Sequence, residues 1–239
     1  TVARDVSLSS LSVFAASAAL PETVQQWSDA PEPAGIQIIS ATVETLLSEF
    51  GTVIANYTVA HAVPTSIVVL SDGTRTAEAE CLAWLWELGV RTHPKFAGLQ
   101  SDNNEIYKMT AAMWRKNTTS KYINAAVEAA APKVLVTHID SEEAPLGAAQ
   151  FTAEYVRKAA RSFDVPKLYM ATAGGACTLP TDEPLVAADG LTAKELVNKA
   201  YAVCVSRHQF QPELAENASF TLAETMVGED TAGNDLLEN

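Results

Sequence analysis

The sequence of 239 residues has few cysteines and no long apolar run. Its three cysteines, Cys81, Cys177 and Cys204, are odd in number and far apart, which argues against a disulfide framework and against a cysteine-clustered metal site. We therefore expect no metal and a reducing compartment, either the cytoplasm or the interior of an organelle. Because no apolar run approaches the ~20 residues that span a bilayer, we also expect no membrane association.

Basic side chains are also scarce. Sixteen lysines and arginines stand against 29 acidic residues, which gives a formal net charge of −13. Such a surface repels phosphate polyanions on average, so a nucleic-acid role would require a locally basic patch. The sequence has no GxxxxGK[ST] or GxGxxG pattern, and we expect no nucleotide or other cofactor.

Hydrophobic residues make up 48% of the chain, enough for a sizeable core. A stretch rich in Pro, Gly and acidic residues, Asp29 to Gly35, separates an N-terminal segment (1–34) from the main body. From residue 35 to 171, apolar β-branched runs alternate with helical patterns, which is typical of an α/β domain with helices layered around a mostly parallel sheet. We expect a C-terminal helical extension over 172–227 and a flexible acidic tail over 228–239.

The expected strands are short, apolar runs bounded by Gly, Pro or Asp. They are Ile36–Ile39, Ser66–Leu70, Lys133–Ile139 and Lys167–Ala171. The second and third are continuous apolar runs, which indicates central strands covered on both faces. The expected helices are Ala41–Tyr57, Thr76–Leu88, Asn104–Lys116, Ser120–Ala130, Phe151–Phe163 and Thr192–Arg207.

The carboxyl ends of parallel strands are where open α/β sheets bind ligands. Behind the second expected strand, Asp72 and Arg75 could hold an anion at the start of the next helix, although ordinary turn and capping residues explain the same pattern. Behind the third, we expect His138 and Asp140 to project to one face, where they could form a proton-transfer pair or contribute to a metal site; a polar strand end that leads into an acidic loop explains the same residues. Cys177 follows a Gly-Gly pair and could be a nucleophile or a buried thiol.

A basic and aromatic window runs from Lys95 to Tyr122. Its candidate binding residues are Lys95, Lys108, Trp114, Arg115, Lys116 and Lys121. Interleaved cations and rings of this kind could contact phosphate and stack on bases. A solvated pair of amphipathic helices is the alternative interpretation.

The segment from Ser66 to Glu143 contains, in order, a strand, a helix, a later helix over 121–131 and a second strand over 133–140. The first helix ends with the sequence Leu-Ala-Trp-Leu-Trp-Glu-Leu-Gly-Val at residues 82–90. In this order of elements the segment resembles the anticodon-binding domain of class II aminoacyl-tRNA synthetases of the histidyl type. The resemblance covers about a third of the chain and implies an α/β fold with RNA as its partner.

Three functional hypotheses follow. The first is a noncatalytic recognition module that binds RNA or a protein partner through the Lys95 to Tyr122 window. The second is a small-molecule enzyme whose site lies at the strand ends. Its anion-binding and acid/base groups would be Asp72, Arg75, His138 and Asp140. The third is a structural subunit of a larger assembly or oligomer, with the helix that carries Trp84 and Trp86 packed against another chain.

Overall fold

A computed structural model describes residues 26–28, 33–71, 74–100, 105–204 and 214–238. The strands are β1 (Ile36–Ser40), β2 (Thr65–Ser71), β3 (Lys95–Leu99), β4 (Val134–Thr137), β5 (Lys167–Ala171), β6 (Cys177–Pro180) and β7 (Asn217–Thr225). The helices are α2 (Val43–Ile54), α3 (Arg75–Glu87), α4 (Tyr107–Trp114), α5 (Lys116–Ala130), α6 (Gly147–Ser162) and α7 (Ala193–Tyr201), with a π-helical turn η1 (Ala55–Ala60) and a short 3-10 helix η2 (Val186–Ala188).

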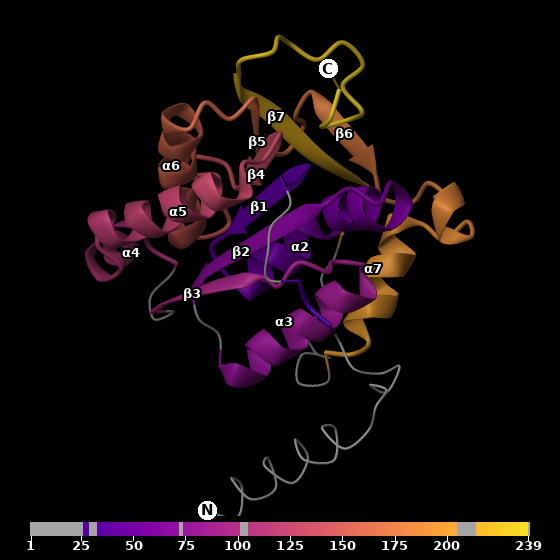
Figure 1. Ribbon diagram of the computed structural model, residues 1–239, viewed down its shortest axis with the longest axis horizontal. Coiled ribbons are helices and arrows are strands. Elements are labelled where there is room, and N and C mark those ends of the chain that lie inside the picture. Colours follow the sequence, from indigo (N-terminus) through magenta and orange to yellow (C-terminus); the bar gives the residue numbers. More distant parts are fainter. Residues whose placement is uncertain (1–25, 29–32, 72–73, 101–104, 205–213, 239) are drawn as a thin grey trace, which may run out of the picture.

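The strands form one mixed sheet in the order β3-β2-β1-β4-β5-β7-β6 (Figure 1). Strands β1 to β5 pair in parallel, whereas β7 is antiparallel to both β5 and β6. The prediction of an α/β fold with a mostly parallel sheet is confirmed. The parallel strands place the carboxyl ends of β1, β2, β4 and β5 along one edge of the molecule.

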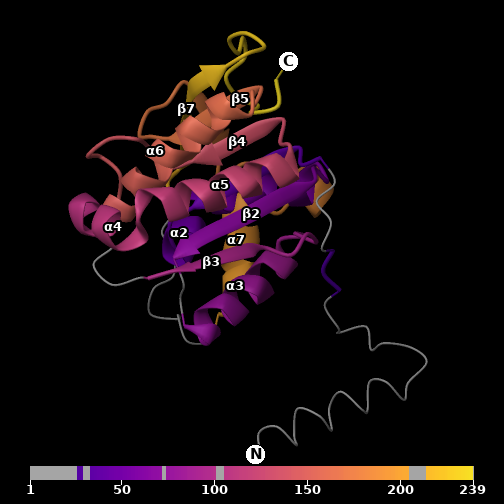
Figure 2. The same ribbon diagram turned by 60° about the vertical axis from the view of Figure 1, so that its left-hand side comes forward.

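Helices cover both faces of the sheet (Figures 1 and 2). Successive side chains of a strand point to opposite faces, so Ile38 of β1 packs with Phe50 of α2 in one core, while Ile39 packs with Val156 of α6 in the other. The first core also holds α3 and α7, and the second holds α4 and α5. Burial on both faces explains why the central strands are continuous apolar runs.

Threonines begin three of the helices. The Thr42 hydroxyl accepts a hydrogen bond from the Thr45 amide at the start of α2, and Thr192 does the same for α7. The Thr74 hydroxyl accepts from the amide of Ala77 and caps α3. The segment before α3 therefore contains the capping residue that the ordinary turn interpretation expects.

Three strands were absent from the sequence-based assignment. β3 is an edge strand with the sequence KFAGL, which lacks the continuous apolar run of a central strand. β6 and β7 lie within residues 172–227, where we expected a helical extension. That segment does contain α7, but its strands extend the central sheet beyond β5.

The acidic C-terminal segment, for which we expected a flexible tail, packs against the fold over residues 228–238. The Lys167 ammonium is 2% exposed and hydrogen-bonds Asp230 and the carbonyl of Glu238, while Tyr169 donates to the same Asp230 carboxylate. Leu236 is fully buried and its amide donates to the Tyr57 hydroxyl at 2.6 Å. None of the helices in the described ranges combines the length and the apolar character needed to span a membrane.

Removing the carboxylate of Asp230 tests how strongly this segment stabilises the fold. We expect Asp230→Ala to lower the free energy of unfolding by about 3 kcal/mol, because it leaves the buried Lys167 charge without its carboxylate. The control is Asp182→Ala, which breaks the exposed Lys194–Asp182 pair at 3.6 Å and should cost less than about 1 kcal/mol. Urea denaturation measures both; equal losses would contradict the structural role of the segment.

Glu238 makes the stability that this segment contributes to the fold depend on pH. Its carboxylate accepts hydrogen bonds from the Thr231 hydroxyl and from the amides of Thr231, Ala232 and Gly233, which lower its pKa from 4.5 to about 2. A depressed pKa stabilises the folded state above the unfolded value of 4.5, and this contribution is lost as the pH falls toward 2. We expect Glu238→Gln to flatten the acid side of the stability curve measured by denaturation between these values. An unchanged curve would contradict the assignment.

Candidate active site

A cavity of about 690 Å³ opens beyond the carboxyl ends of β4 and β5. Its walls come from the middle of α2, the residues after β4 and β5, and the start of β7. The lining residues are Ser48, Glu49, Thr52, Ile139, Glu143, Ala171, Thr172, Ala173, Gly174, Leu214, Ala215, Asn217, Ala218, Ser219 and Phe220. This volume is within the range of small-molecule sites, and its position follows the rule for parallel sheets.

Glu49 and His138 form a hydrogen-bonded pair at this cavity. The His138 side chain is fully buried at the end of β4, and its Nδ1 atom contacts the Glu49 carboxylate. Glu49 lies on α2, lines the cavity and remains 22% exposed. The pair therefore joins a buried imidazole to a carboxylate that a ligand can reach.

The backbone fixes the tautomer of His138. The Ala41 amide donates to Nε2 at 2.9 Å, which requires a lone pair on that nitrogen. The proton of the neutral ring is therefore on Nδ1, where it is donated to Glu49. Phe50 packs 5.1 Å from the imidazole, ring centre to ring centre, and helps to exclude water from it.

A line of polar residues along α2 brings Glu49 to this position. Thr42, Thr45, Glu49, Thr52 and Asn56 recur at alternating spacings of three and four, so they share one face of the helix. Glu44 and Ser48 are exposed on another side, and most of the remaining residues are apolar. All residues of the line are buried except Glu49, which is partly exposed. Sequence reasoning missed Glu49, although this polar line within a mostly apolar helix was the signal that marked it.

The Gly-Gly pair after β5 shapes the opposite wall. A Cβ atom on Gly175 would lie 2.3 Å from the carbonyl oxygen of Phe220, so only glycine permits this approach to β7. Gly174 has φ +70° and lines the cavity. The Thr172 amide donates to the Ser219 carbonyl at 3.0 Å and ties this loop to β7.

His138 and Asp140 do not face the same way. β4 ends at Thr137, so neither residue belongs to the strand whose alternation would have aligned them. His138 contacts α2, whereas Asp140 pairs with Arg157 of α6 at 3.0 Å, on the other face of the sheet. Burial raises the pKa of the Asp140 carboxyl above its ordinary value, while Arg157 acts in the opposite direction.

The remaining strand-end candidates lie away from the cavity. Arg75 is exposed at the start of α3, beyond β2, and is not among the residues that line it. Asp72 lies outside the described residues. Cys177 is buried, and burial raises the pKa of its thiol to about 11, which disfavours the thiolate that a nucleophile requires. Within the described ranges, no three His, Cys, Asp or Glu side chains are placed to hold a metal ion.

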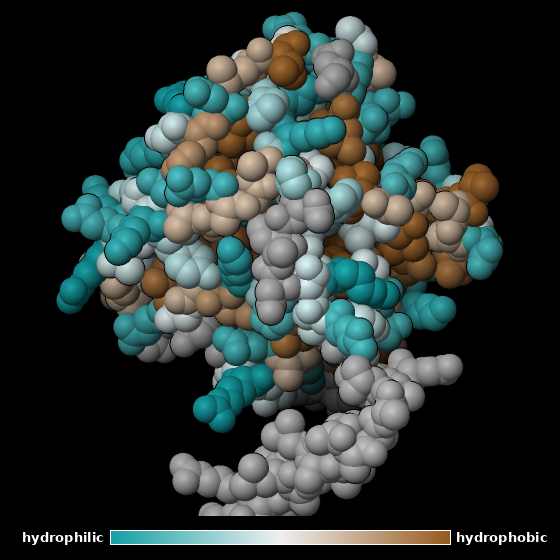
Figure 3. Space-filling model, in the orientation of Figure 1, coloured by the Kyte–Doolittle hydropathy of each residue, from teal (hydrophilic) through white to brown (hydrophobic). Residues whose placement is uncertain are grey.

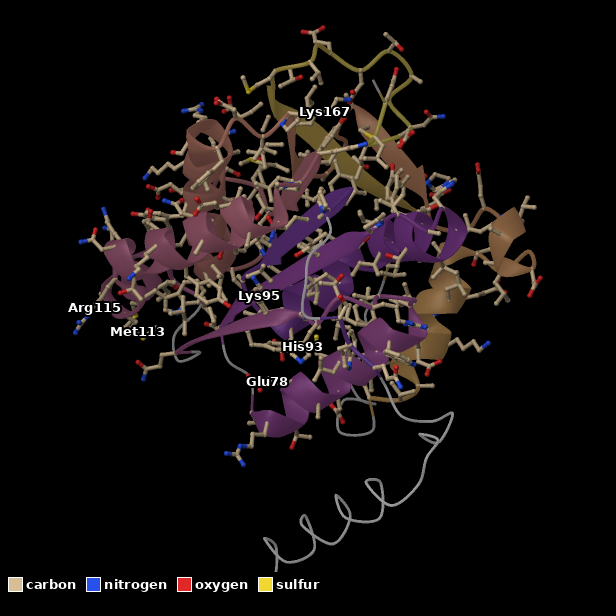
Figure 4. All side chains as sticks on the ribbon, viewed as in Figure 1. Glu78, His93, Lys95, Met113, Arg115 and Lys167 are labelled. Carbon is tan, nitrogen blue, oxygen red and sulfur yellow. The ribbon has the colours of Figure 1, made fainter. Side chains whose placement is uncertain are left out.

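The basic and aromatic window does not form a stacking surface. The Trp114 ring is buried in the second core, and its Nε1 atom donates to the Gln100 carbonyl at 2.8 Å. Lys95 on β3 and Arg115 at the α4–α5 junction lie well apart (Figure 4). Lys108, Lys116 and Lys121 are exposed on α4 and α5, where hydrophilic residues face solvent (Figure 3). This is the arrangement of solvated amphipathic helices.

The tryptophans of α3 also pack within the chain. Trp84 is fully buried in the first core. Trp86 makes an edge contact with Trp27, with ring centres 5.3 Å apart, and the Arg91 guanidinium lies 3.9 Å from its ring centre. Both rings therefore make packing contacts within the chain.

Comparison with known proteins places the fold. No family model matches the sequence, and no curated protein does. Among solved structures, a conserved protein of Thermus thermophilus has a TM-score of 0.59 at 12% identity, over 82% of this chain and 97% of its own. The 4-carboxy-2-hydroxymuconate hydratase of Pseudomonas putida has a TM-score of 0.56 at 12% identity, over 82% and 99%. At this identity the likeness shows a shared fold.

These findings overturn the resemblance to an anticodon-binding domain. The fold that matches extends over 82% of the chain, well beyond the Ser66 to Glu143 segment on which the resemblance depended. The leading hypothesis of a noncatalytic module that binds RNA is wrong as well. The solved structures with this fold include a hydratase, and the Trp114 ring expected to stack on bases is buried.

The tautomer of His138 is a direct test of the site geometry. We expect nitrogen-15 NMR of the imidazole to show a protonated Nδ1 and an unprotonated Nε2, because the Ala41 amide occupies the Nε2 lone pair. The exposed His93 in the same spectrum is an internal reference. A proton on Nε2 would contradict the arrangement.

Proposed function

We propose that this chain is a small-molecule enzyme that uses water as a nucleophile and Glu49 as a general base. The observation that carries the proposal is a carboxylate that lines a cavity while a fully buried, neutral histidine holds it in place. Carboxylates positioned in this way are common proton acceptors in enzymes. The proposal replaces the recognition module and retains only His138 from the strand-end candidates.

The chemistry follows from the position of Glu49. Glu49 takes a proton from a water molecule as the oxygen of that water bonds to an electrophilic carbon of the substrate. The electron pair of the carbon's double bond moves to the far atom, which then receives the proton from Glu49. The net reaction is addition of water. Where a leaving group departs from that carbon with the proton, the outcome is hydrolysis.

His138 is a positioning residue in this scheme. Its Nδ1–H donates to the carboxylate and holds it at the cavity wall. Among the described residues, His138 is the hydrogen-bond partner of the Glu49 carboxylate. Thr172, Asn217 and Ser219 line the same cavity and supply neutral polar groups that can orient a substrate.

The likeness to a hydratase is consistent with water addition, but it is a likeness of fold. The Glu49–His138 geometry therefore supports the reaction class. The compared structures leave the choice between hydration and hydrolysis to experiment.

The test is a turnover screen of the purified chain against amides, esters and unsaturated compounds, each class including amine-bearing, neutral and anionic members, followed by substitution of the base. We expect Glu49→Gln to lower kcat by about 10²- to 10⁴-fold, because the amide has the shape of the carboxylate but cannot accept the proton. Glu128→Gln, on the exposed side of α5 across the sheet, is the matched control and should retain full activity.

Two outcomes would contradict the proposal. One is a substrate that turns over at the same rate with Glu49→Gln as with the unaltered chain. The other is a complete lack of turnover across the whole screen. Unfolding curves of both variants establish that any loss of activity is not a loss of fold.

A further inference from the structure

The charges around the cavity have one sign. Among the described lining residues, Glu49 and Glu143 are the charged ones, and the other polar groups are hydroxyls and an amide. Glu143 lies in the turn after β4, where its amide donates to the Ser141 hydroxyl at 3.2 Å. A ligand in this cavity therefore meets two carboxylates.

Basic side chains of the neighbouring elements are engaged elsewhere. Lys167 is at the opposite end of β5 from the cavity and pairs with Asp230, near β7 and the C-terminal segment (Figure 4). Arg157 lies on the other face of the sheet and pairs with Asp140 and Glu224. Neither cation lies at the cavity, so among the described residues the charged side chains that line it are carboxylates.

One part of the wall is apolar. Ile139, Leu214 and Phe220 are apolar residues of the lining beside the small residues after β5, and Phe220 is only 1% exposed. Such a wall favours burial of a compact hydrophobic group. The cavity thus combines an acidic region with a region suited to a ring or a short aliphatic body.

We propose that the substrate of this site is a small amine in its protonated form. In this arrangement Glu143 pairs with the ammonium group, the apolar wall takes the body of the molecule, and Glu49 is left to act on water. The inference rests on the proposed function for the role of Glu49, and it adds the charge class of the substrate. Anionic substrates are disfavoured because two carboxylates repel them.

A matched series of probes tests the charge class. Benzylamine, benzyl alcohol and benzoate share one ring and carry charges of about +1, 0 and −1 near pH 7. We expect saturation-transfer NMR titrations of the whole chain at low salt to show benzylamine binding about tenfold more tightly than benzyl alcohol, with benzoate weakest. The preference should shrink in about 0.5 M sodium chloride, since salt screens exposed charges.

Two adjacent glutamates provide the variant and its control. Both are exposed, but Glu143 is among the residues that line the cavity and Glu142 is not. Glu143→Gln should weaken benzylamine binding about fivefold and leave benzyl alcohol unaffected, while Glu142→Gln should change neither. Both positions are on the surface, so the two variants should fold alike.

The inference is overturned if benzoate binds as tightly as benzylamine, if none of the probes binds, or if both glutamate variants act alike. Its failure is distinguishable from failure of the proposed function. If the chain prefers anions but loses turnover with Glu49→Gln, the role of Glu49 as general base is supported and only the amine substrate is contradicted. If the chain binds benzylamine but turns over its substrate equally well with Glu49→Gln, the role of Glu49 as general base is contradicted.

Discussion

The hydrogen bonds of His138 are the constraint on which the site depends. A fully buried imidazole has no water around it, so each ring nitrogen needs a partner from the chain. The Ala41 amide, directly after β1, donates to Nε2, and the Glu49 carboxylate of α2 accepts from Nδ1. One side chain at the end of β4 thereby couples two central strands to the helix that crosses them, and it sets the position of the carboxylate at the cavity.

The surrounding packing makes that coupling rigid. α2 buries Leu46, Phe50 and Val53 and exposes Glu44 and Ser48, so its rotation about its own axis is fixed by what must be buried. Across the cavity, Gly175 permits β7 to approach the loop after β5 within a distance that no side chain would allow. The C-terminal segment closes the far end of β5 through Lys167 and Asp230. The cavity therefore lies between elements that pack closely on their neighbours.

The strands that are buried on both faces, and the helices between them, were predicted from the sequence. A short continuous apolar run such as the one in β2 marks a buried strand because it would be costly to expose in a loop or at a sheet edge. Strands β3, β6 and β7, which lie toward the edges and lack such runs, were missed. His138 was a predicted site residue, but its partner Glu49 depends on which face of α2 meets β4, a tertiary fact. The anticodon-binding resemblance failed because an order of strands and helices is shared by many unrelated α/β domains.

A crystal structure of the chain with a turned-over substrate or its slow analogue tests the central claim most directly, because it shows which groups surround the reacting carbon. The account predicts that this carbon lies within about 3.5 Å of a water molecule that is hydrogen-bonded to Glu49. It also predicts that His138 keeps its contacts with Ala41 and Glu49. A substrate bound outside the cavity, or bound in it with its reacting carbon remote from Glu49, would contradict the account.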